Sequence, residues 1–376
     1  MKKALLIFTA LSVAFFSGAQ NNFQFKTVVE AKNTKTKDQA NTGTCWSFAT
    51  ISFLESEALR NSNDTFDLSE MFMVRYSYPK KALKYFEPAK ETPRFAEGGL
   101  SHDVMYIIKN YGLVPDQAFN GLHYGLPYHD HAELDAMLSG LVSGLKKSNV
   151  PISSNILNSV DLILDNYLGE VPSYFSYKGQ SHTPQSFAKD VIKINPDDYI
   201  SITSFTHHPY NSKFVLEIPD NWFGGEYYNV ELNEFIEIMD YALQNGYTVA
   251  WDGDVSEREF AHKKGVALWP AKLWKDKTAD EQKAFGNAYE PELAITAEIR
   301  QQNFENGTTT DDHLMHITGI ANDAAGNKYY ITKNSWGEKS NSFSGKLYMS
   351  EAYVRMKSIS FMVHKNALPN KMAKKL

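Results

Sequence analysis

The chain has a single cysteine, Cys45, among its 376 residues. No disulfide can form within it, so the fold has to be held by a buried apolar core. A chain of this length buries enough apolar surface to do so without covalent cross-links. A lone cysteine is a reactive thiol, one half of an intermolecular bridge, or a small apolar side chain in the core, since free cysteine is among the most buried residue types.

The first 19 residues have the pattern of an export signal. Two lysines precede an almost wholly apolar run at residues 4–16, and the small residues Ser17, Gly18 and Ala19 follow. This order is typical of a cleaved signal peptide, so we expect cleavage after Ala19 and a periplasmic or secreted protein. Cysteines of exported proteins usually occur in pairs, which makes an unpaired thiol informative.

Charge and hydropathy argue against two classes of partner. The formal net charge is −6, and neither sign is gathered in one segment. Nucleic-acid binding and attachment to an anionic membrane both rely on a basic patch. After the signal, no stretch reaches the roughly 18 consecutive apolar residues of a membrane span. We therefore expect no nucleic acid as a partner and no membrane span.

The spacing of apolar residues changes from helical to strand-like along the chain. Helical spacing covers residues 46–60, 68–86, with a kink or break at Pro79, and 101–110. The predicted strands are residues 199–205, 214–218, 247–254, 316–323, 328–335, 345–350 and 359–365, with one helix at 232–244 among them. Helices early and strands late predict an α+β fold with two packed halves.

Residues 128–198 differ from both halves, because short helical pieces alternate there with polar joints. We interpret them as a mostly helical insertion whose apolar stripe packs against the protein rather than a membrane. The expected organisation is a signal peptide at 1–19, a helical lobe at 20–127, the insertion, a β-rich lobe at 199–364 and a C-terminal tail at 365–376.

Cys45 lies where the first predicted helix begins. The N–H groups at a helix start lower the pKa of a thiol, and the thiolate is the nucleophilic form. Such a nucleophile needs a base and a group that orients the base. His316 opens one strand-like run and Asn334 ends the next, across a hairpin-like connection at 322–327. We therefore predict that these two side chains lie side by side, with Trp336 covering them.

Three short groups resemble fragments of metal sites. His207 with His208, and His313 with His316, each offer two ligands, but zinc needs three or four and the sequence indicates no third. The aspartates of residues 251–254 lack the remaining oxygen ligands of a calcium site. We predict no metal and no organic cofactor.

Four motifs in order carry a resemblance to a known family: "QANTGTCWSFA" at 39–49, "EGG" at 97–99, "HITG" at 316–319 and "NSWG" at 334–337. Together they resemble the papain-like cysteine peptidases. Longer stretches, such as "FDLSEMFMVRYSYPKK" and "GYTVAWDGDVSE", resemble the bleomycin hydrolase and aminopeptidase C group. The resemblance implies a two-lobed papain-like fold, a peptide substrate and hydrolysis through a thiolate acyl-enzyme.

The resemblance also implies roles for the matching residues. Cys45 matches the nucleophile, His316 the general base, Asn334 the orienting group and Gln39 the side-chain donor of the oxyanion hole. The positions that match substrate-contacting residues are Gly98, Gly99, Trp336 and Leu376.

In this group the tail lies in the cleft and its terminal carboxylate, here that of Leu376, meets the free amino group of the substrate. The resemblance therefore implies an aminopeptidase, and also a homo-oligomer, because the group forms hexameric cages. The tail of this chain differs from the small, apolar family tail, since it carries Lys371, Lys374 and Lys375. Two alternatives stay open: an endopeptidase or dipeptidyl-peptidase on the same fold, and a non-catalytic binding protein on a papain scaffold.

Overall fold

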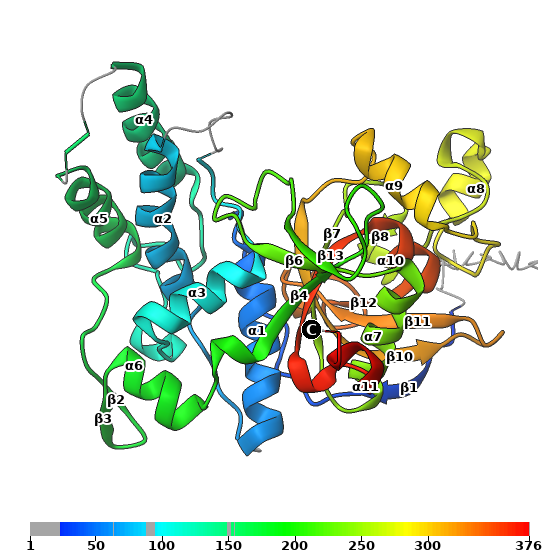
Figure 1. Cartoon of the computed structure of the whole chain (residues 1–376), viewed down its shortest axis with the longest axis horizontal. Coiled ribbons are helices and arrows are strands. Elements are labelled where there is room, and N and C mark those ends of the chain that lie inside the picture. Colours follow the sequence, from blue (N-terminus) through cyan, green and yellow to red (C-terminus); the bar gives the residue numbers. More distant parts are fainter. Residues whose placement is uncertain (1–22, 63, 88–94, 149–151, 154, 376) are drawn as a thin grey trace, which may run out of the picture.

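The structure is a computed structural model that describes residues 23–375, except 63, 88–94, 149–151 and 154. The export signal expected at 1–19 lies outside the described residues. Two halves lie side by side, one built from helices and the other around a large sheet (Figure 1). No helix in the described part of the chain is long and apolar enough to cross a membrane.

The helical half is built around α1 (Cys45–Ser62), which is buried along its length from Cys45 to Ala58. Helices α2 (Glu70–Phe86) and α3 (Ser101–Tyr111) pack against it. The Ser69 hydroxyl caps α2 by accepting a hydrogen bond from the Phe72 N–H at 3.0 Å. The helix runs through Pro79 without a break, so the break considered at that position is absent.

The predicted insertion extends the core of the helical half. Its helices α4 (Ala132–Ser148) and α5 (Asn155–Leu168) bury apolar residues in the same hydrophobic cluster as α1 to α3. Arg75 on α2 ties α5 in place, with ion pairs of 2.7 Å to Asp161 and 2.8 Å to Asp165. A short hairpin of β2 (Phe175–Tyr177) and β3 (Gln180–His182), α6 (Pro184–Ser186) and a π-helical turn (Phe187–Ile192) complete the segment.

The other half is an 11-stranded sheet with the order β5-β6-β4-β13-β7-β10-β11-β12-β9-β8, and β1 pairs with β10 beside this path. Its strands are β1 (Lys26–Glu30), β4 (Tyr199–Thr203), β5 (Ser212–Val215), β6 (Glu226–Asn229), β7 (Val249–Gly253), β8 (Phe260–Ala261), β9 (Val266–Ala267), β10 (His313–Asn322), β11 (Lys328–Lys333), β12 (Lys346–Ser350) and β13 (Ser358–His364). Its helices are α7 (Leu232–Gln244), α8 (Ala279–Ala284), α9 (Ala297–Glu305), α10 (Glu351–Lys357) and α11 (Asn370–Ala373). Six of the seven predicted strands and the helix at 232–244 are confirmed, whereas the strand predicted at 214–218 overlaps β5 only at its first two residues, because β5 ends at Val215.

The segment before α1 belongs to the sheet half and not to the helical lobe, where it was predicted. It contributes β1, which pairs antiparallel with β10 in the sheet, whereas we assigned residues 20–127 to the helical lobe. After β1 the chain crosses to the helical half and enters α1. This crossing places the start of α1 beside the sheet.

The register of β10 and β11 decides which side chains meet at the junction of the two halves. The strands are antiparallel, and His316 lies opposite Lys333. Residues opposite each other share a face of the sheet, and successive residues alternate between faces. The next position, Asn334, therefore points to the face opposite to that of His316, and His313 lies on the same face as Asn334.

Candidate active site

Cys45 is the first residue of α1 and lies in a hollow between the two halves. The carbonyl of the preceding Thr44 accepts the N–H groups of Ser47 at 3.0 Å and Phe48 at 3.2 Å, which starts the helix. The hollow has a volume of about 620 Å³. It is lined by Gln39, Thr42, Gly43, Cys45, Ala96, Glu97, Gly98, Asp135, Pro219, Asp220, Val255, Asp311, Asp312, His313 and Trp336.

His313 stands beside Asn334 in this site. Its Nε2 donates to Asn334 Oδ1 at 2.8 Å, and the Ser335 N–H donates to the same oxygen at 2.7 Å. Because Nε2 carries the proton, the neutral ring keeps its lone pair on Nδ1. The Trp336 ring lies over the imidazole with centroids 5.2 Å apart. The arrangement holds one tautomer of a buried histidine in the hollow that also contains the Cys45 thiol.

The predicted contact between His316 and Asn334 is wrong. His316 is fully buried on the other face of β10, where its Nδ1 lies 2.8 Å from the Ser52 hydroxyl of α1. Its ring meets Phe53 edge-on at 6.2 Å. Two histidines three positions apart on a strand must face opposite sides, and choosing between them required the register to Asn334. The histidine that shares the hollow with Cys45 is His313.

The thiol and the imidazole are both neutral as separate groups. Burial raises the pKa of Cys45 to about 12, although a hydrogen bond from the Leu314 backbone lowers it, and the carboxylates of Asp220, Asp311 and Asp252 raise it further. Burial lowers the pKa of His313 to about 4, against the hydrogen bond to Asn334. A thiolate–imidazolium pair therefore forms only when the proton passes from Cys45 to His313, because each of the two charges then stabilises the other.

Gln39 lies in the hollow with Cys45, as the sequence predicts. The Ser335 hydroxyl donates to its Oε1 at 2.5 Å, which fixes the orientation of the amide. Nε2 donates one of its two hydrogens to the Thr42 carbonyl at 2.7 Å. The second hydrogen is left to donate to a ligand in the hollow.

The two glycines expected to contact substrate have different surroundings. Gly98 lines the hollow, and a Cβ at this position would lie 2.0 Å from Asp220 Oδ2. Gly99 lies against the Trp46 ring, at 3.1 Å from where its Cβ would be. Trp336 lines the hollow as expected and also contacts the His262 ring, with centroids 4.7 Å apart.

The C-terminal tail does not enter the hollow in the described residues. Met372 of α11 is 2% exposed in the core of the sheet half, and Lys375 Nζ pairs with Glu234 of α7 at 2.8 Å. The Tyr228 hydroxyl donates to the Lys375 carbonyl at 3.4 Å. Leu376, predicted to meet the substrate, lies outside the described residues. The tail up to Lys375 therefore runs along α7, in contrast to the placement that the resemblance implies.

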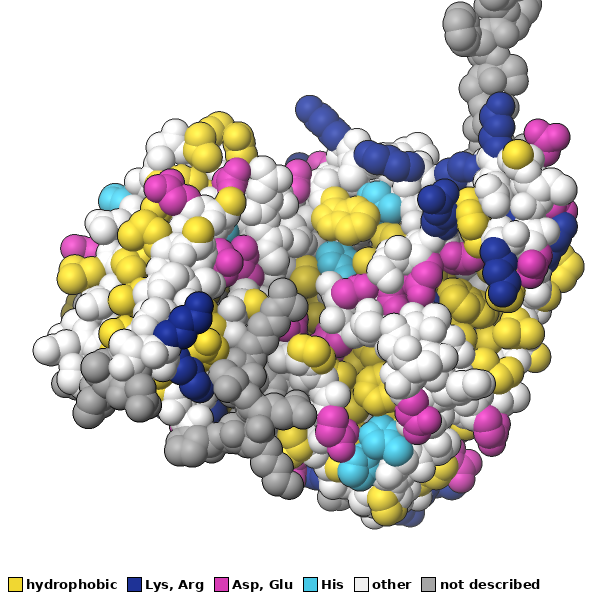
Figure 2. All heavy atoms as spheres, turned by 90° about the horizontal axis from the view of Figure 1, so that it is seen from above, with side chains coloured by type: hydrophobic (Ala, Val, Ile, Leu, Met, Phe, Trp, Pro, Cys, Tyr) yellow, Lys and Arg dark blue, Asp and Glu magenta, His cyan; other side chains and the backbone are white. Residues whose placement is uncertain are grey.

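An acidic lining of the hollow was missed by the sequence analysis. Five carboxylates line it: Glu97, Asp135, Asp220, Asp311 and Asp312. Asp252 on β7 lies behind Asp311 and accepts the Ser360 hydroxyl at 2.9 Å. Figure 2 shows acidic side chains along the middle of the face where the two halves meet. These residues come from distant segments, so no sequence motif indicated that they would meet.

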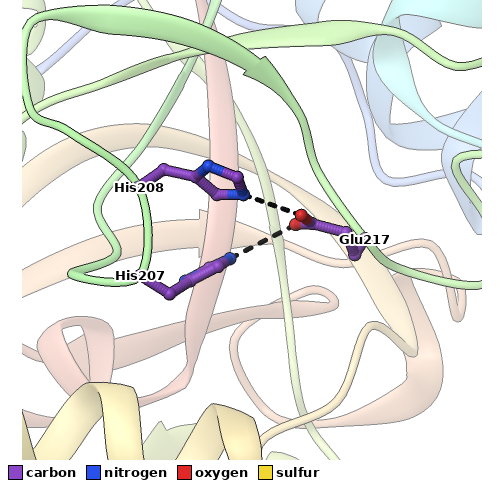
Figure 3. Close-up of side chains that lie close together, drawn as sticks. All are labelled: His207, His208 and Glu217. Carbon is purple, nitrogen blue, oxygen red and sulfur yellow. Dashed lines mark hydrogen bonds and ion pairs between the residues drawn. The ribbon is translucent and has the colours of Figure 1, made fainter.

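His207 and His208 have a third partner that the sequence did not indicate, Glu217 (Figure 3). Their Nε2 atoms lie 3.2 Å and 2.7 Å from its two carboxylate oxygens. Gln301 Nε2 donates to His207 Nδ1 at 3.0 Å, while Gln301 Oε1 accepts the Thr206 N–H at 2.6 Å. Since Nδ1 accepts, Nε2 of His207 carries the proton and donates to Glu217. A protonated nitrogen is no metal ligand, so this group is a hydrogen-bonded cluster.

Comparison with known proteins identifies the family of the chain. The family model described as "Peptidase C1-like family" matches residues 173–376, and the model "Papain family cysteine protease" matches residues 20–159. A helix-borne cysteine beside a histidine–asparagine pair in a two-lobed α+β fold defines a papain-like cysteine peptidase. The chain belongs to the peptidase C1-like family.

Among known relatives, aminopeptidase G of Lactobacillus delbrueckii subsp. lactis is 22% identical over 369 residues, covering 88% of this chain and 81% of the relative. The mitochondrial cysteine proteinase 1 of Saccharomyces cerevisiae is 22% identical over 406 residues, covering 95% of this chain and 80% of the relative. The crystal structure of PepW from Lactobacillus rhamnosis HN001 superposes with a TM-score of 0.72 at 20% identity, covering 95% of this chain and 85% of PepW. The predicted papain-like α+β fold is confirmed.

Proposed function

We propose that this cysteine peptidase is an aminopeptidase that removes N-terminal residues from peptides. The observation that carries the peptidase chemistry is the placement of Cys45 at the start of α1 in one hollow with His313 and its partner Asn334. The names of the relatives, which include aminopeptidases G, W and C, support the exopeptidase specificity.

The chemistry begins with the transfer of the Cys45 thiol proton to His313 Nδ1. The thiolate attacks the scissile carbonyl carbon, and the resulting oxyanion accepts hydrogen bonds from the Cys45 N–H and Gln39 Nε2. The imidazolium then donates its proton to the leaving amine as the C–N bond breaks, which leaves a thioester. Water attacks the thioester with His313 as base, so the acid product leaves and the thiol is restored.

Three features of the site favour formation of the charged pair. Asn334 Oδ1 holds the imidazole through Nε2, so the ring gains its second proton without turning. The Leu314 backbone hydrogen bond lowers the pKa of the Cys45 thiol. Trp336 covers His313 and keeps water away from the pair, which strengthens the attraction between the two charges.

The proposal is tested with two fluorogenic peptides that differ only in a free or an acetylated amino terminus, with Cys45→Ala as control. Cleavage of the free peptide alone is the expected result. Cleavage of both peptides would favour the endopeptidase alternative. Failure to cleave either, together with a thiol that iodoacetamide does not alkylate in the folded protein, would favour the non-catalytic binding protein.

We also propose that the protein is exported and works in the periplasm or outside the cell. The proposal rests on the signal pattern of residues 1–19, with its lysines, apolar run and small residues before Gln20. N-terminal sequencing of the mature protein from fractionated cells tests it. A chain that begins at Gln20 in the exported fraction is expected, whereas an uncleaved chain confined to the cytoplasm would contradict it.

A further inference from the structure

The Asn334 amide has a second end that the proposed mechanism does not use. Its Oδ1 accepts hydrogen bonds from His313 Nε2 and the Ser335 N–H. At the other end, its Nδ2 donates to Nδ1 of His262 at 3.4 Å. His262 lies in the short turn His262–Lys264 that follows β8, and it is 6% exposed. A second buried histidine therefore contacts the far end of the amide that orients His313.

The hydrogen bonds of Ser340 determine which nitrogen of His262 carries the proton. The Ser340 hydroxyl donates its one hydrogen to the Gly337 carbonyl at 2.7 Å. At its second contact, with His262 Nε2 at 2.9 Å, the hydroxyl oxygen must therefore accept, so Nε2 carries the proton. The lone pair of the neutral ring is then on Nδ1 and faces the Asn334 amide nitrogen, which can only donate. The hydrogen bonds at the two ring nitrogens are consistent with one tautomer.

The surroundings of His262 fix its position and keep its ring neutral. Asn341 Nδ2 donates to the His262 carbonyl at 3.0 Å, and the Trp336 ring packs against the imidazole with centroids 4.7 Å apart. Burial lowers the pKa of His262 to about 4, and the positive charges of Lys263 and of a protonated His313 lower it further. The ring is therefore uncharged at neutral pH, as the acceptor role of Nδ1 requires.

The orientation of the Asn334 amide decides whether His313 can act as a base. An asparagine amide can turn by half a rotation, which exchanges its oxygen and nitrogen with little change of shape. In the turned amide, Nδ2 would face His313 Nε2, which could then only accept, so the proton of the neutral ring would be on Nδ1. Nδ1 could no longer take the proton of Cys45, and this tautomer would be inactive. The turned amide would also bring Oδ1 against the lone pair of His262 Nδ1, which is repulsive.

We propose that His262 is a positioning residue for the peptidase reaction, because its Nδ1 accepts from Asn334 Nδ2 and so keeps Asn334 Oδ1 directed at His313. The Ser335 N–H supports the same orientation at the oxygen end, so both ends of the amide are held. The inference rests on the proposed roles of Cys45 and His313 and deepens them, and it applies to an aminopeptidase and an endopeptidase alike. His262 is 72 positions from Asn334 in the chain, and no motif connects the two.

The test compares His262→Gln with His262→Asn in the full chain, because the two amides replace different nitrogens of the ring. The asparagine amide reaches the position of Nδ1 and can accept from Asn334, whereas the glutamine amide reaches the position of Nε2 and replaces only the contact with Ser340. Kinetics are measured on the fluorogenic peptide that the wild type cleaves. We expect His262→Gln to lower kcat at least about tenfold with KM nearly unchanged, because the inactive tautomer of His313 becomes populated. Alkylation of Cys45 by iodoacetamide should slow by a similar factor.

Three further variants complete the comparison. His262→Asn should restore kcat to within about threefold of wild type, since it keeps the acceptor. His262→Phe keeps a ring against Trp336 but has no acceptor, so the same fall is expected of it as of His262→Gln. His364→Gln is the matched control, because His364 packs against Tyr199 and Tyr247 and lines neither the hollow of Cys45 nor the neighbouring one beyond Trp336. Its kcat should equal that of wild type.

Thermal unfolding of each variant establishes that it is folded. An unchanged kcat in folded His262→Gln or His262→Phe would overturn the inference. An equal fall in the asparagine and glutamine variants would also overturn it, because the whole ring and not its Nδ1 would then matter. A change confined to KM would overturn it as well, since it would place His262 against the substrate. Failure of the wild type to cleave any peptide, with Cys45 inert to iodoacetamide, would instead overturn the proposed function itself.

Discussion

At the scale of single residues, the two histidines of β10 have different roles: His313 is placed for catalysis, and His316 is part of the core. His313 lies in the hollow and its Nε2 is held by Asn334, whereas His316 is fully buried against Ser52 of α1. We expect His313→Ala to lower kcat/KM by about 10²–10⁴-fold, the range for loss of a general base, and to slow alkylation of Cys45 by iodoacetamide. Steady-state kinetics and the alkylation rate check both effects.

His316→Asn is the matched control, because the asparagine amide reaches the position of Nδ1 beside Ser52. This variant is expected to keep its activity within a few-fold of wild type and to unfold at a lower temperature, since a buried ring is lost. A folded His316→Asn protein without activity, paired with an active His313→Ala protein, would reverse the assignment.

At the scale of elements, the tail helix α11 lies against α7. Met372 is buried in the core of the sheet half, and Lys375 pairs with Glu234. We therefore expect that deletion of Leu376 alone leaves the preference for a free over an acetylated amino terminus unchanged. Deletion of residues 370–376 removes Met372 and exposes the apolar core surface against which it packs, so it should lower the melting temperature. The preference for a free amino terminus should be unchanged.

The activity ratio on the two substrates measures this directly in both truncated chains. Efficient cleavage of the acetylated peptide after loss of Leu376 would mean that the tail carboxylate guards the cleft, as the family resemblance implies. The internal comparison is with Lys375→Ala, which breaks the pair with Glu234 and leaves the terminal carboxylate in place.

The elements also show what sequence can and cannot predict in this protein. The helix at 232–244 and the strands of the sheet follow from local periodicity, and Cys45, Gln39 and Asn334 follow from motifs at fixed spacing. The choice between His313 and His316 depended on strand register, which is set by pairing between distant segments. The acidic cluster was out of reach for the same reason, because Asp220, Asp252 and Asp311 meet only in the folded chain.

At the scale of the whole molecule, two sets of buried groups act on stability with opposite signs. Burial raises the pKa of one set of carboxyl groups to about 7: Glu70, Asp252, Glu257, Glu292 and Asp312. Burial lowers the pKa of one set of histidines to about 4: His129, His262 and His313. As the pH rises, the carboxyl groups keep their protons to a higher pH in the folded chain than in the unfolded chain. The histidines lose theirs at a lower pH in the folded chain.

Stability rises with pH wherever the unfolded chain binds more protons. The histidines therefore raise stability from pH about 4 to their ordinary 6.5, and the carboxyl groups lower it from their ordinary 3.8 to 4.5 up to about 7. Over most of this interval the two sets oppose each other, and above pH 6.5 only the carboxyl groups still act. Because five carboxyl groups oppose three histidines, their combined effect lowers stability across this interval, and we expect the melting temperature to fall from about pH 5 to pH 7.5.

Thermal unfolding of Cys45→Ala, which cannot digest itself, followed by circular dichroism at constant ionic strength measures this profile. Glu292 accepts the Trp269 N–H at 2.6 Å and the Ser350 hydroxyl at 2.5 Å, so Glu292→Gln keeps one carbonyl acceptor and removes one titrating group. This variant should show a smaller fall between pH 6.5 and 7.5 than its parent. A melting temperature that rises over that interval would mean that the buried carboxyl groups are ionised well below neutral pH, with partners strong enough to outweigh their burial.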